Sequence, residues 1–264
     1  MTFHEPELHI RPLAKAFAFE RPDAKAGLVL VHGFGDSPYS MRSLGRLLHD
    51  DGYDVRVPRL PGHGSRLEHF YRARLDDWRW TVRSELELLR SRHGPNVVLL
   101  GRSFGGVLSL LELAEHPNAA AGIILVATPQ HIGAERLLRR VLPVLGLVKK
   151  NVKKPWVKPH ERVSRLETGR YEHFPIPALR ECLRGITQLT PEFLSRITVP
   201  TLILHGDHDR IAAPQSASYF YDHIGSTDKR LVMVPSATHA AEILHNDPLF
   251  LRELLAFLGR IFQA

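Results

Sequence analysis

The sequence of 264 residues contains a single cysteine, Cys182. One cysteine excludes an intramolecular disulfide and any zinc or iron–sulfur site built from cysteine thiolates. No apolar run approaches the roughly 18 residues that a membrane-spanning helix requires. The first residues also lack the basic and apolar regions of a secretory signal. We therefore expect a cytoplasmic protein without stable membrane insertion.

Acidic residues are fewer than basic ones, 28 against 35, so the net charge is +7. Hydrophobic residues make up 44% of the chain and charged residues 24%, which is ordinary for a globular protein and excludes wholesale disorder. The length suits one large domain better than two independent ones. The basic residues are not interleaved with a run of stacking aromatic residues, so no nucleic-acid partner is expected.

Short apolar runs alternate with helical patterns along most of the chain. Continuous apolar runs such as Gly27–Val31 are typical of strands buried on both faces. The alternation predicts an α/β fold, with a mostly parallel sheet covered by helices on both faces. Antiparallel strands are expected at one edge, within Ile10–Phe19. The other predicted strands are 27–31, 53–57, 96–100, 122–126, 201–204 and 230–234, and predicted helices include one capped by Ser37, 76–93, 104–115 and 248–262.

The strand–helix rhythm is interrupted once. About seventy residues between Ala127 and Pro200 contain no clear strand. Long connections in compact domains usually form lids or binding loops. We therefore predict a mainly helical cap over residues 130–196, inserted between core segments 1–129 and 197–264.

A candidate nucleophile lies between a predicted strand and a predicted helix. Gly101-Arg102-Ser103-Phe104-Gly105 has the form G-x-S-x-G. A serine on this sharp turn presents its hydroxyl above the sheet, and crowding in the turn requires glycine at both two-residue offsets. The helix N-terminus also offers amide groups to a developing anion. The alternative is a glycine-rich turn with a capping serine.

A second glycine-containing turn follows the first predicted strand, at His32-Gly33-Phe34-Gly35. Such a turn can aim the Phe34 amide at the point served by the Phe104 amide, and two such donors form an oxyanion hole. A dinucleotide-binding fingerprint is excluded because it needs glycine where Pro38 stands. A plain strand-to-helix turn remains as the alternative.

Two aspartates, Asp207 and Asp209, follow the predicted strand at 201–204. Asp209 fits a catalytic acid better, because the aliphatic Ile211 two positions later can pack into the core. Asp207 suits hydrogen bonding to loop amides. His239 follows the last predicted strand on a loop of small residues, where an imidazole can reach a serine. The order Ser, Asp, His, each at a strand end, distinguishes it from the other histidines.

The many histidines raise the question of a metal site. His205 and His208 flank Asp207, but this spacing does not bring ligands together reliably, and no H-E-x-x-H motif occurs. We expect neither a metal nor a cofactor. The Pro61–Gly64 segment is expected to fix a loop near the mouth of the active site.

Taken together, these motifs resemble the α/β-hydrolase superfamily, and within it the bacterial carboxylesterases and monoacylglycerol lipase-like serine esterases. The resemblance spans nearly the whole chain except about residues 130–190, the variable cap of that family. It rests on HGFGDSP, LPGHG, DDW and GRSFGG, together with the Gly206-x-x-Asp209 turn and Thr238-His239.

The resemblance implies specific roles. Ser103 is the nucleophile, His239 the base, Asp209 the orienting acid, and Phe34 and Phe104 provide the backbone oxyanion donors. The serine argues against epoxide hydrolases and haloalkane dehalogenases, which have aspartate there. The arginine before it, at position 102, departs from many relatives, which carry a small or aliphatic residue.

The expected function is hydrolysis of small carboxylic esters through an acyl-enzyme, as a carboxylesterase on short- to medium-chain acyl esters. One alternative is a monoacylglycerol lipase, since Val141–Val148 is an apolar stretch between basic pairs that suits lipid contact or an acyl pocket. Packing of that stretch within the cap is equally open. A non-catalytic ligand-binding homologue is an alternative of another class. The sequence does not indicate the oligomeric state.

The positive charge is concentrated in one segment. Residues 131–170 contain eleven lysines and arginines against three glutamates, a net charge of +8, and the rest of the chain carries −1. This places the charge on the predicted cap. It predicts attraction of anionic substrates or peripheral contact with an anionic lipid surface, with a solvated face as the alternative.

Overall fold

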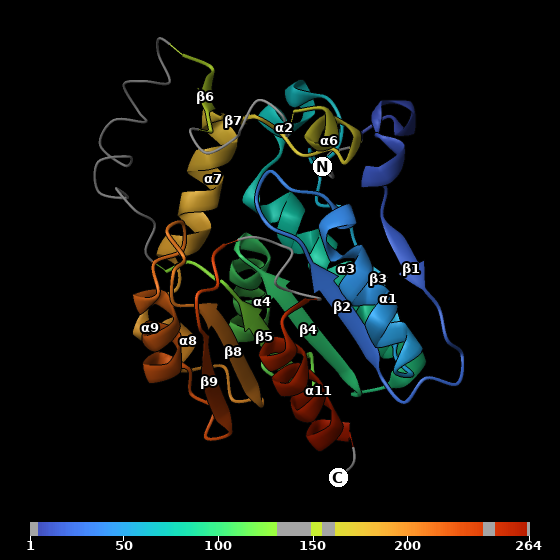
Figure 1. Cartoon of the computed structure of the whole chain (residues 1–264), viewed down its shortest axis with the longest axis vertical. Coiled ribbons are helices and arrows are strands. Elements are labelled where there is room, and N and C mark those ends of the chain that lie inside the picture. The colour runs from blue at the N-terminus through green and yellow to red at the C-terminus, as the bar shows by residue number, and fades with distance from the viewer. Residues whose placement is uncertain (1–4, 131–148, 155–161, 240–245, 263–264) are drawn as a thin grey trace.

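The computed structural model describes residues 5–130, 149–154, 162–239 and 246–262 (Figure 1). Its main sheet has seven strands in the order β1-β3-β2-β4-β5-β8-β9. Only β1 runs antiparallel to its neighbour, and the other pairs are parallel. The strands are β1 Phe17–Phe19, β2 Gly27–Val31, β3 Asp54–Val57, β4 Val97–Arg102, β5 Gly122–Val126, β8 Thr201–Gly206 and β9 Lys229–Val234.

Helices cover both faces of this sheet (Figure 1). Helices α3, α4, α7 and α9 contribute to the core on one face, and α1 and α11 to the core on the other. The described α-helices are α1 Arg42–Asp50, α2 Leu67–Arg72, α3 Leu75–His93, α4 Phe104–Glu115, α6 Arg162–Glu167, α7 Ile176–Thr187, α8 Pro191–Leu194, α9 Gln215–His223 and α11 Pro248–Phe262, with 3-10 turns at Glu7–His9, Pro12–Ala14 and Pro38–Met41.

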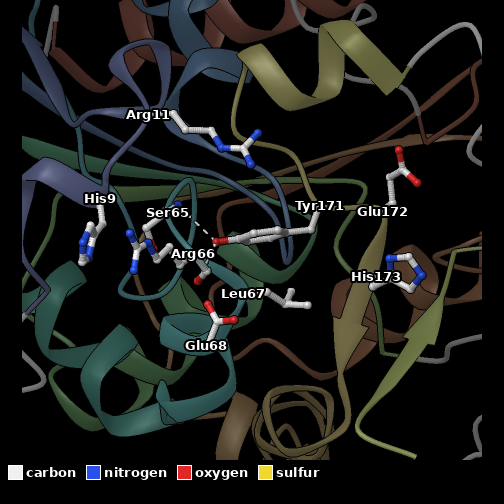
Figure 2. Close-up of a pocket in the computed structure, with 9 residues that line it drawn as sticks. All are labelled: His9, Arg11, Ser65, Arg66, Leu67, Glu68, Tyr171, Glu172 and His173. Atoms are coloured by element: carbon white, nitrogen blue, oxygen red, sulfur yellow. Dashed lines mark hydrogen bonds between the residues drawn. The ribbon is translucent and has the colours of Figure 1, made fainter.

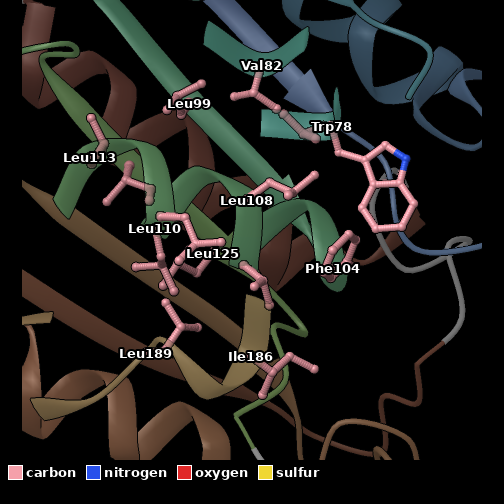
Figure 3. Close-up of a cluster of buried hydrophobic side chains, with 14 of the residues drawn as sticks. Trp78, Val82, Leu99, Phe104, Leu108, Leu110, Leu113, Leu125, Ile186 and Leu189 are labelled. Atoms are coloured by element: carbon pink, nitrogen blue, oxygen red, sulfur yellow. The ribbon is translucent and has the colours of Figure 1, made fainter. Parts of the chain in front are cut away.

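The apolar runs of the central strands fill both cores. In β2, Val29 and Val31 face one cluster, and Leu28 and Leu30 face the other. Figure 3 shows the first cluster, in which α4 packs against the sheet and against Trp78 of α3. Complete burial of one such aliphatic side chain contributes about 1.5–3 kcal/mol. These cores hold rigid the strand ends that carry the candidate functional residues.

The predicted α/β fold is confirmed, and β2, β5, α4 and α11 have the predicted limits. Strand β4 extends two residues further than predicted, to Arg102, so it leads directly into Ser103. Ser37 stands at the N-cap position of the turn Pro38–Met41 and is followed by the first-turn proline, as predicted, but its hydroxyl donates to the Thr168 carbonyl and not to an amide of the turn. Of the expected edge strands within 10–19, only Phe17–Phe19 forms.

The segment predicted as a cap contains strand as well as helix. Strands β6 Asn151–Lys153 and β7 His173–Pro175 form a separate antiparallel pair, followed by α7. These strands have only three residues each, too few to show a clear alternating pattern. The apolar stretch 141–148 lies outside the described residues, and the division into core and cap stays a prediction. Among the described helices, none is long and apolar enough to cross a membrane.

Candidate active site

Ser103 occupies the turn between β4 and α4. Its φ of 52° lies in the left-handed region, which is strained for a residue with a side chain. A Cβ atom on Gly101 would lie 2.4 Å from the Cα of Gly106, and one on Gly105 would lie 2.1 Å from the Val31 carbonyl oxygen. Both flanking glycines are therefore required by close backbone approach. The serine side chain remains partly exposed above the sheet.

His239 follows β9 and reaches back to the serine. Its Nε2 lies 3.0 Å from the Ser103 Oγ, and its Nδ1 lies 2.7 Å from Asp209 Oδ2. The three side chains come from the ends of β4, β8 and β9, which lie at the same edge of the sheet because the strands are parallel. With Nδ1–H donating to the carboxylate, Nε2 is left to accept the serine proton.

The two candidate aspartates differ sharply in environment. The Asp209 side chain is fully buried, whereas that of Asp207 is 44% exposed and pairs with His208. Burial acts to raise the pKa of Asp209, but the hydrogen bond and charge of His239 and the Ile211 amide outweigh it, so the pKa lies below its ordinary value. Asp209 is therefore ionised where it meets the imidazole.

The neighbouring histidine on β8 supports this loop. His205 is buried, its Nε2–H donates to the Ala212 carbonyl at 3.0 Å, and Nε2 also lies 3.7 Å from Asp209 Oδ2. Burial lowers the pKa of His205, so the ring is neutral near pH 7. His208 points elsewhere, toward Asp207. The two histidines thus have separate partners, and no group of three metal-binding side chains occurs within the described ranges.

The turn after β2 lies against the serine. A Cβ atom on Gly33 would come within 3.2 Å of the Ser103 Cβ, so the turn backbone passes directly beside it. His32 braces the turn: its Nδ1 donates to the Gly33 carbonyl and its Nε2 accepts from the Leu60 amide. Burial lowers the pKa of His32 to about 4, which keeps the ring neutral as both bonds require.

The residues Phe34 and Phe104, whose amides are the candidate oxyanion donors, lie on the two turns that meet at Ser103. Across the described chain, neither donates a backbone hydrogen bond within a turn or loop, and Phe104 is the first residue of α4, where the amide has no partner in its own helix. The two phenyl rings meet edge to face at 5.7 Å. The structure thus brings together all five residues singled out in the sequence.

Sequence reasoning missed two charged residues beside the site. Arg102 donates from Nη1 to Asp36 at 3.0 Å and from Nη2 to the His239 carbonyl at 2.6 Å. Both side chains are largely buried. Arg102 stood out in the sequence as a departure from many relatives, but no pattern in the sequence linked it to Asp36 or to His239.

Lys154, counted from the sequence among the basic residues of the predicted cap, is buried against this turn. Its Nζ donates to the Gly35 carbonyl at 3.2 Å and lies 4.2 Å from the centre of the Phe174 ring. The Tyr171 amide donates to the same carbonyl. Burial lowers the pKa of Lys154 to about 7. Residues around β6 and β7 therefore hold the turn after β2 in place.

A surface hollow of about 290 Å³ lies at the junction of the N-terminal segment, the start of α2 and β7 (Figure 2). None of its lining residues is Ser103, Asp209 or His239. The hydroxyl of Tyr171 accepts from the Ser65 amide and donates to the Gly62 carbonyl. This tyrosine therefore fixes the end of the Pro61–Gly64 loop, a role that sequence motifs did not indicate.

Comparisons with known proteins identify the family of the chain. The sequence model of the family described as serine aminopeptidase, S33, matches residues 22–248. The chain is 32% identical to a thermostable monoacylglycerol lipase of Bacillus sp. (strain H-257), over 94% of this chain and 96% of the relative. It is 27% identical to a carboxylesterase of Bacillus subtilis (strain 168), over 94% and 97%.

A solved structure supports the same fold. The fold is similar to that of a solved structure from a study of LipS and LipT, two metagenome-derived lipolytic enzymes. The TM-score is 0.81 at 26% sequence identity, and the match covers 95% of this chain and 99% of the other. The chain belongs to the serine aminopeptidase S33 family of α/β hydrolases. It is a carboxylic ester hydrolase.

Proposed function

We propose that Ser103 is the nucleophile, His239 the general base and Asp209 the orienting acid of this esterase. The observation that carries the proposal is the continuous contact from the Ser103 hydroxyl to His239 at 3.0 Å and from His239 to Asp209 at 2.7 Å. These separations are within the range for proton transfer and for fixing the tautomer of the base.

The oxyanion donors in this proposal are the amides of Phe34 and Phe104. Both flank the serine, and the Phe104 amide lies at the N-terminus of α4, where the helix dipole favours negative charge. Loss of one such donor typically costs about 2.7–4 kcal/mol of transition-state stabilisation.

The reaction then has two halves. The Ser103 oxygen bonds to the ester carbonyl carbon while His239 takes the hydroxyl proton, and the tetrahedral oxyanion accepts hydrogen bonds from the two amides. The carbon–oxygen ester bond breaks, and His239 returns the proton to the leaving alcohol. A water molecule, deprotonated by the same imidazole, releases the acid and restores Ser103. Each step uses groups of the chain, ester and water, so no cofactor is needed.

We propose a carboxylesterase that prefers short- to medium-chain acyl esters. The surroundings of Phe34 support an apolar acyl group, because its ring packs 4.9 Å from those of Phe70 and Phe174. A monoacylglycerol lipase is the second candidate, favoured by the relative that is 32% identical.

A comparison of kcat/KM for p-nitrophenyl acetate, butyrate, octanoate and palmitate with that for micellar 1-monooleoylglycerol separates the two. The carboxylesterase proposal expects the maximum at butyrate or octanoate. A maximum on the micellar substrate, with a rise in rate at its critical micelle concentration, would contradict the carboxylesterase proposal and support a monoacylglycerol lipase.

We also propose that residues 130–196 act as a cap on this site. The contacts of Thr168 with Ser37 and of Lys154 and Tyr171 with Gly35 support it, because they join this segment to the turn beside the nucleophile. Cleavage at an engineered protease site beside residue 130 should change KM and chain-length preference while Ser103 stays reactive. Unchanged preference would contradict the cap.

The charge of this segment supports attraction of anionic esters or peripheral contact with anionic lipid. Lys149, Lys150 and Lys153 are exposed on it, and several of the other basic residues lie outside the described ranges. Attraction predicts that salt lowers kcat/KM for an anionic ester more than for its neutral analogue. An identical response to salt excludes it. For the location, we propose the cytoplasm, which the lone cysteine supports.

A further inference from the structure

We infer that Arg102 is a positioning residue that joins the turn after β2 to the loop of His239, and so sets the distance between the oxyanion donors and the general base. The inference rests on the proposed function of Ser103 and His239. It assigns a role to a residue whose identity departs from the usual family pattern.

The first observation is the direction of the two hydrogen bonds. Arg102 is the last residue of β4 and immediately precedes Ser103. Its Nη1 donates to Asp36 Oδ2 at 3.0 Å, and its Nη2 donates to the backbone carbonyl of His239 at 2.6 Å. The guanidinium is planar and rigid, so two bonds from different nitrogens hold their acceptors at a fixed separation.

The second observation is burial. The side chains of Arg102 and Asp36 are 8% and 13% exposed. Burial acts to raise the pKa of Asp36, but the charge of Arg102, together with further contributions that include Arg170 and the Ser37 amide, outweighs it, and the pKa lies below its ordinary value. An ion pair this buried is screened little by solvent, and removal of one partner leaves an uncompensated charge.

The third observation links Asp36 to the turn after β2, which carries the Phe34 amide. The Asp36 amide donates to the Gly33 carbonyl, and its Oδ1 accepts from the Ser37 amide, so the turn closes on the aspartate. A Cβ atom on Gly33 would lie 3.6 Å from Arg102 Nη1 and 3.2 Å from the Ser103 Cβ. The guanidinium therefore lies against the same backbone that presents the Phe34 amide.

These contacts place Arg102 between the turn that carries the Phe34 amide and the loop that carries His239, and both must act in the same step of the reaction. Its bonds end on a carboxylate and a backbone carbonyl, and in the described part of the chain none reaches the hydroxyl of Ser103 or the imidazole of His239. Without the guanidinium, the turn and the histidine loop can move apart, and a misplacement of about 1 Å can cost about 10²-fold in rate.

The test compares Arg102→Met with a matched control, Arg83→Met. Arg83 also makes two bonds to a buried carboxylate, Glu112, but on α3 and α4 away from the site residues. We expect Arg102→Met to lower kcat for p-nitrophenyl butyrate about 10²-fold with little change in KM. Labelling of Ser103 by a fluorophosphonate should slow by a similar factor. Arg83→Met should lower Tm and leave both rates unchanged.

Two further variants separate positioning from stability. The double variant Arg102→Met/Asp36→Asn removes the unpaired buried charge, so it should regain Tm without regaining kcat. Arg102→Lys keeps the charge beside Asp36 but lacks the planar guanidinium that binds both acceptors at once. It should therefore fold with a Tm near that of the wild type and lose about 10-fold in kcat. It also keeps the test decisive if Arg102→Met does not fold.

Full kcat in Arg102→Lys, or recovery of kcat in the double variant, would overturn the inference. Wild-type labelling separates this failure from that of the proposed function. If the fluorophosphonate does not label wild-type Ser103, the proposed function fails. If it labels Ser103 equally fast in wild type and Arg102→Met, only the role of Arg102 fails.

Discussion

Asp209 holds His239 with one carboxylate oxygen and its own loop with the other. Oδ2 lies 2.7 Å from the histidine Nδ1, while Oδ1 accepts from the amides of Ile211 and Ala212 at 2.9 Å. Because backbone amides anchor the carboxylate, the imidazole is held in one orientation, with Nδ1–H toward the acid and Nε2 toward the serine.

This arrangement predicts that Asp209→Asn lowers kcat for p-nitrophenyl butyrate by about 10³–10⁴-fold, because an amide NH2 group facing Nδ1 favours the wrong tautomer. The matched control is Asp207→Asn, whose exposed pair with His208 contributes little. Its kcat should stay within about twofold of the wild type. A larger loss in Asp207→Asn than in Asp209→Asn would reverse the assignment of the acid.

The residues of this contact could be predicted because each follows a strand that the sequence indicates, fully buried in β4 and β8 and partly exposed in β9. The runs before Ser103, Asp209 and His239 form parallel strands, whose C-terminal ends meet at one edge of the sheet. The glycines beside the serine carried the same information, since only glycine fits the close approach of Gly105 to Val31.

The surroundings of these residues could not be predicted, because they depend on contacts between distant segments. Arg102 and Asp36 are 66 positions apart, and neither sits in a pattern that names the other as its partner. Lys154 looked like one more surface lysine in a basic segment, yet it lies 119 positions from Gly35 and beneath Phe174. Tertiary packing decides such contacts.

Lys154 predicts a pH-dependent stability. Burial lowers its pKa from 10.5 to about 7 in the folded protein, so between those values the unfolded chain binds more protons. Stability from this group therefore rises with pH above about 7, by at most about 1.4 kcal/mol per pH unit. Lys154→Met removes this dependence, and its stability advantage over the wild type should be largest at pH 7 and shrink toward pH 9.

Urea unfolding of both proteins at pH 7, 8 and 9 measures this difference. The neighbouring exposed Lys153→Met serves as control and should run parallel to the wild type. A constant difference between Lys154→Met and the wild type at all three pH values would show that Lys154 does not titrate in this range.

The glycine beside the nucleophile predicts a large loss of stability. A Cβ in Gly105→Ala would lie 2.1 Å from the Val31 carbonyl oxygen, so β2 and α4 must separate. We expect at least about 3 kcal/mol of destabilisation in urea unfolding. Gly45 lies within α1, and the new methyl of Gly45→Ala meets the side chains of Phe19 and Val55 at an ordinary contact distance of 3.5 Å, so this variant should be more stable by about 0.4–1 kcal/mol. Equal changes in stability for the two variants would contradict the close backbone approach at the turn between β4 and α4.

Cys182 should be unreactive in the folded enzyme. Its thiol is buried in α7, and burial raises its pKa. A thiolate, the reactive form, is therefore scarce at neutral pH. An excess of 5,5′-dithiobis(2-nitrobenzoate) should leave activity intact and release colour only after urea is added. Rapid release of one equivalent from the native protein would show that α7 opens readily.

Turnover of p-nitrophenyl butyrate by Ser103→Ala tests the central claim most directly. With the nucleophile removed and the fold retained, kcat should fall on the order of 10⁶-fold, and His239→Ala should fall by a similar factor because the two act as a unit. A Tm near that of the wild type confirms that the variant is folded. Retention of most of the wild-type turnover by folded Ser103→Ala would contradict the account.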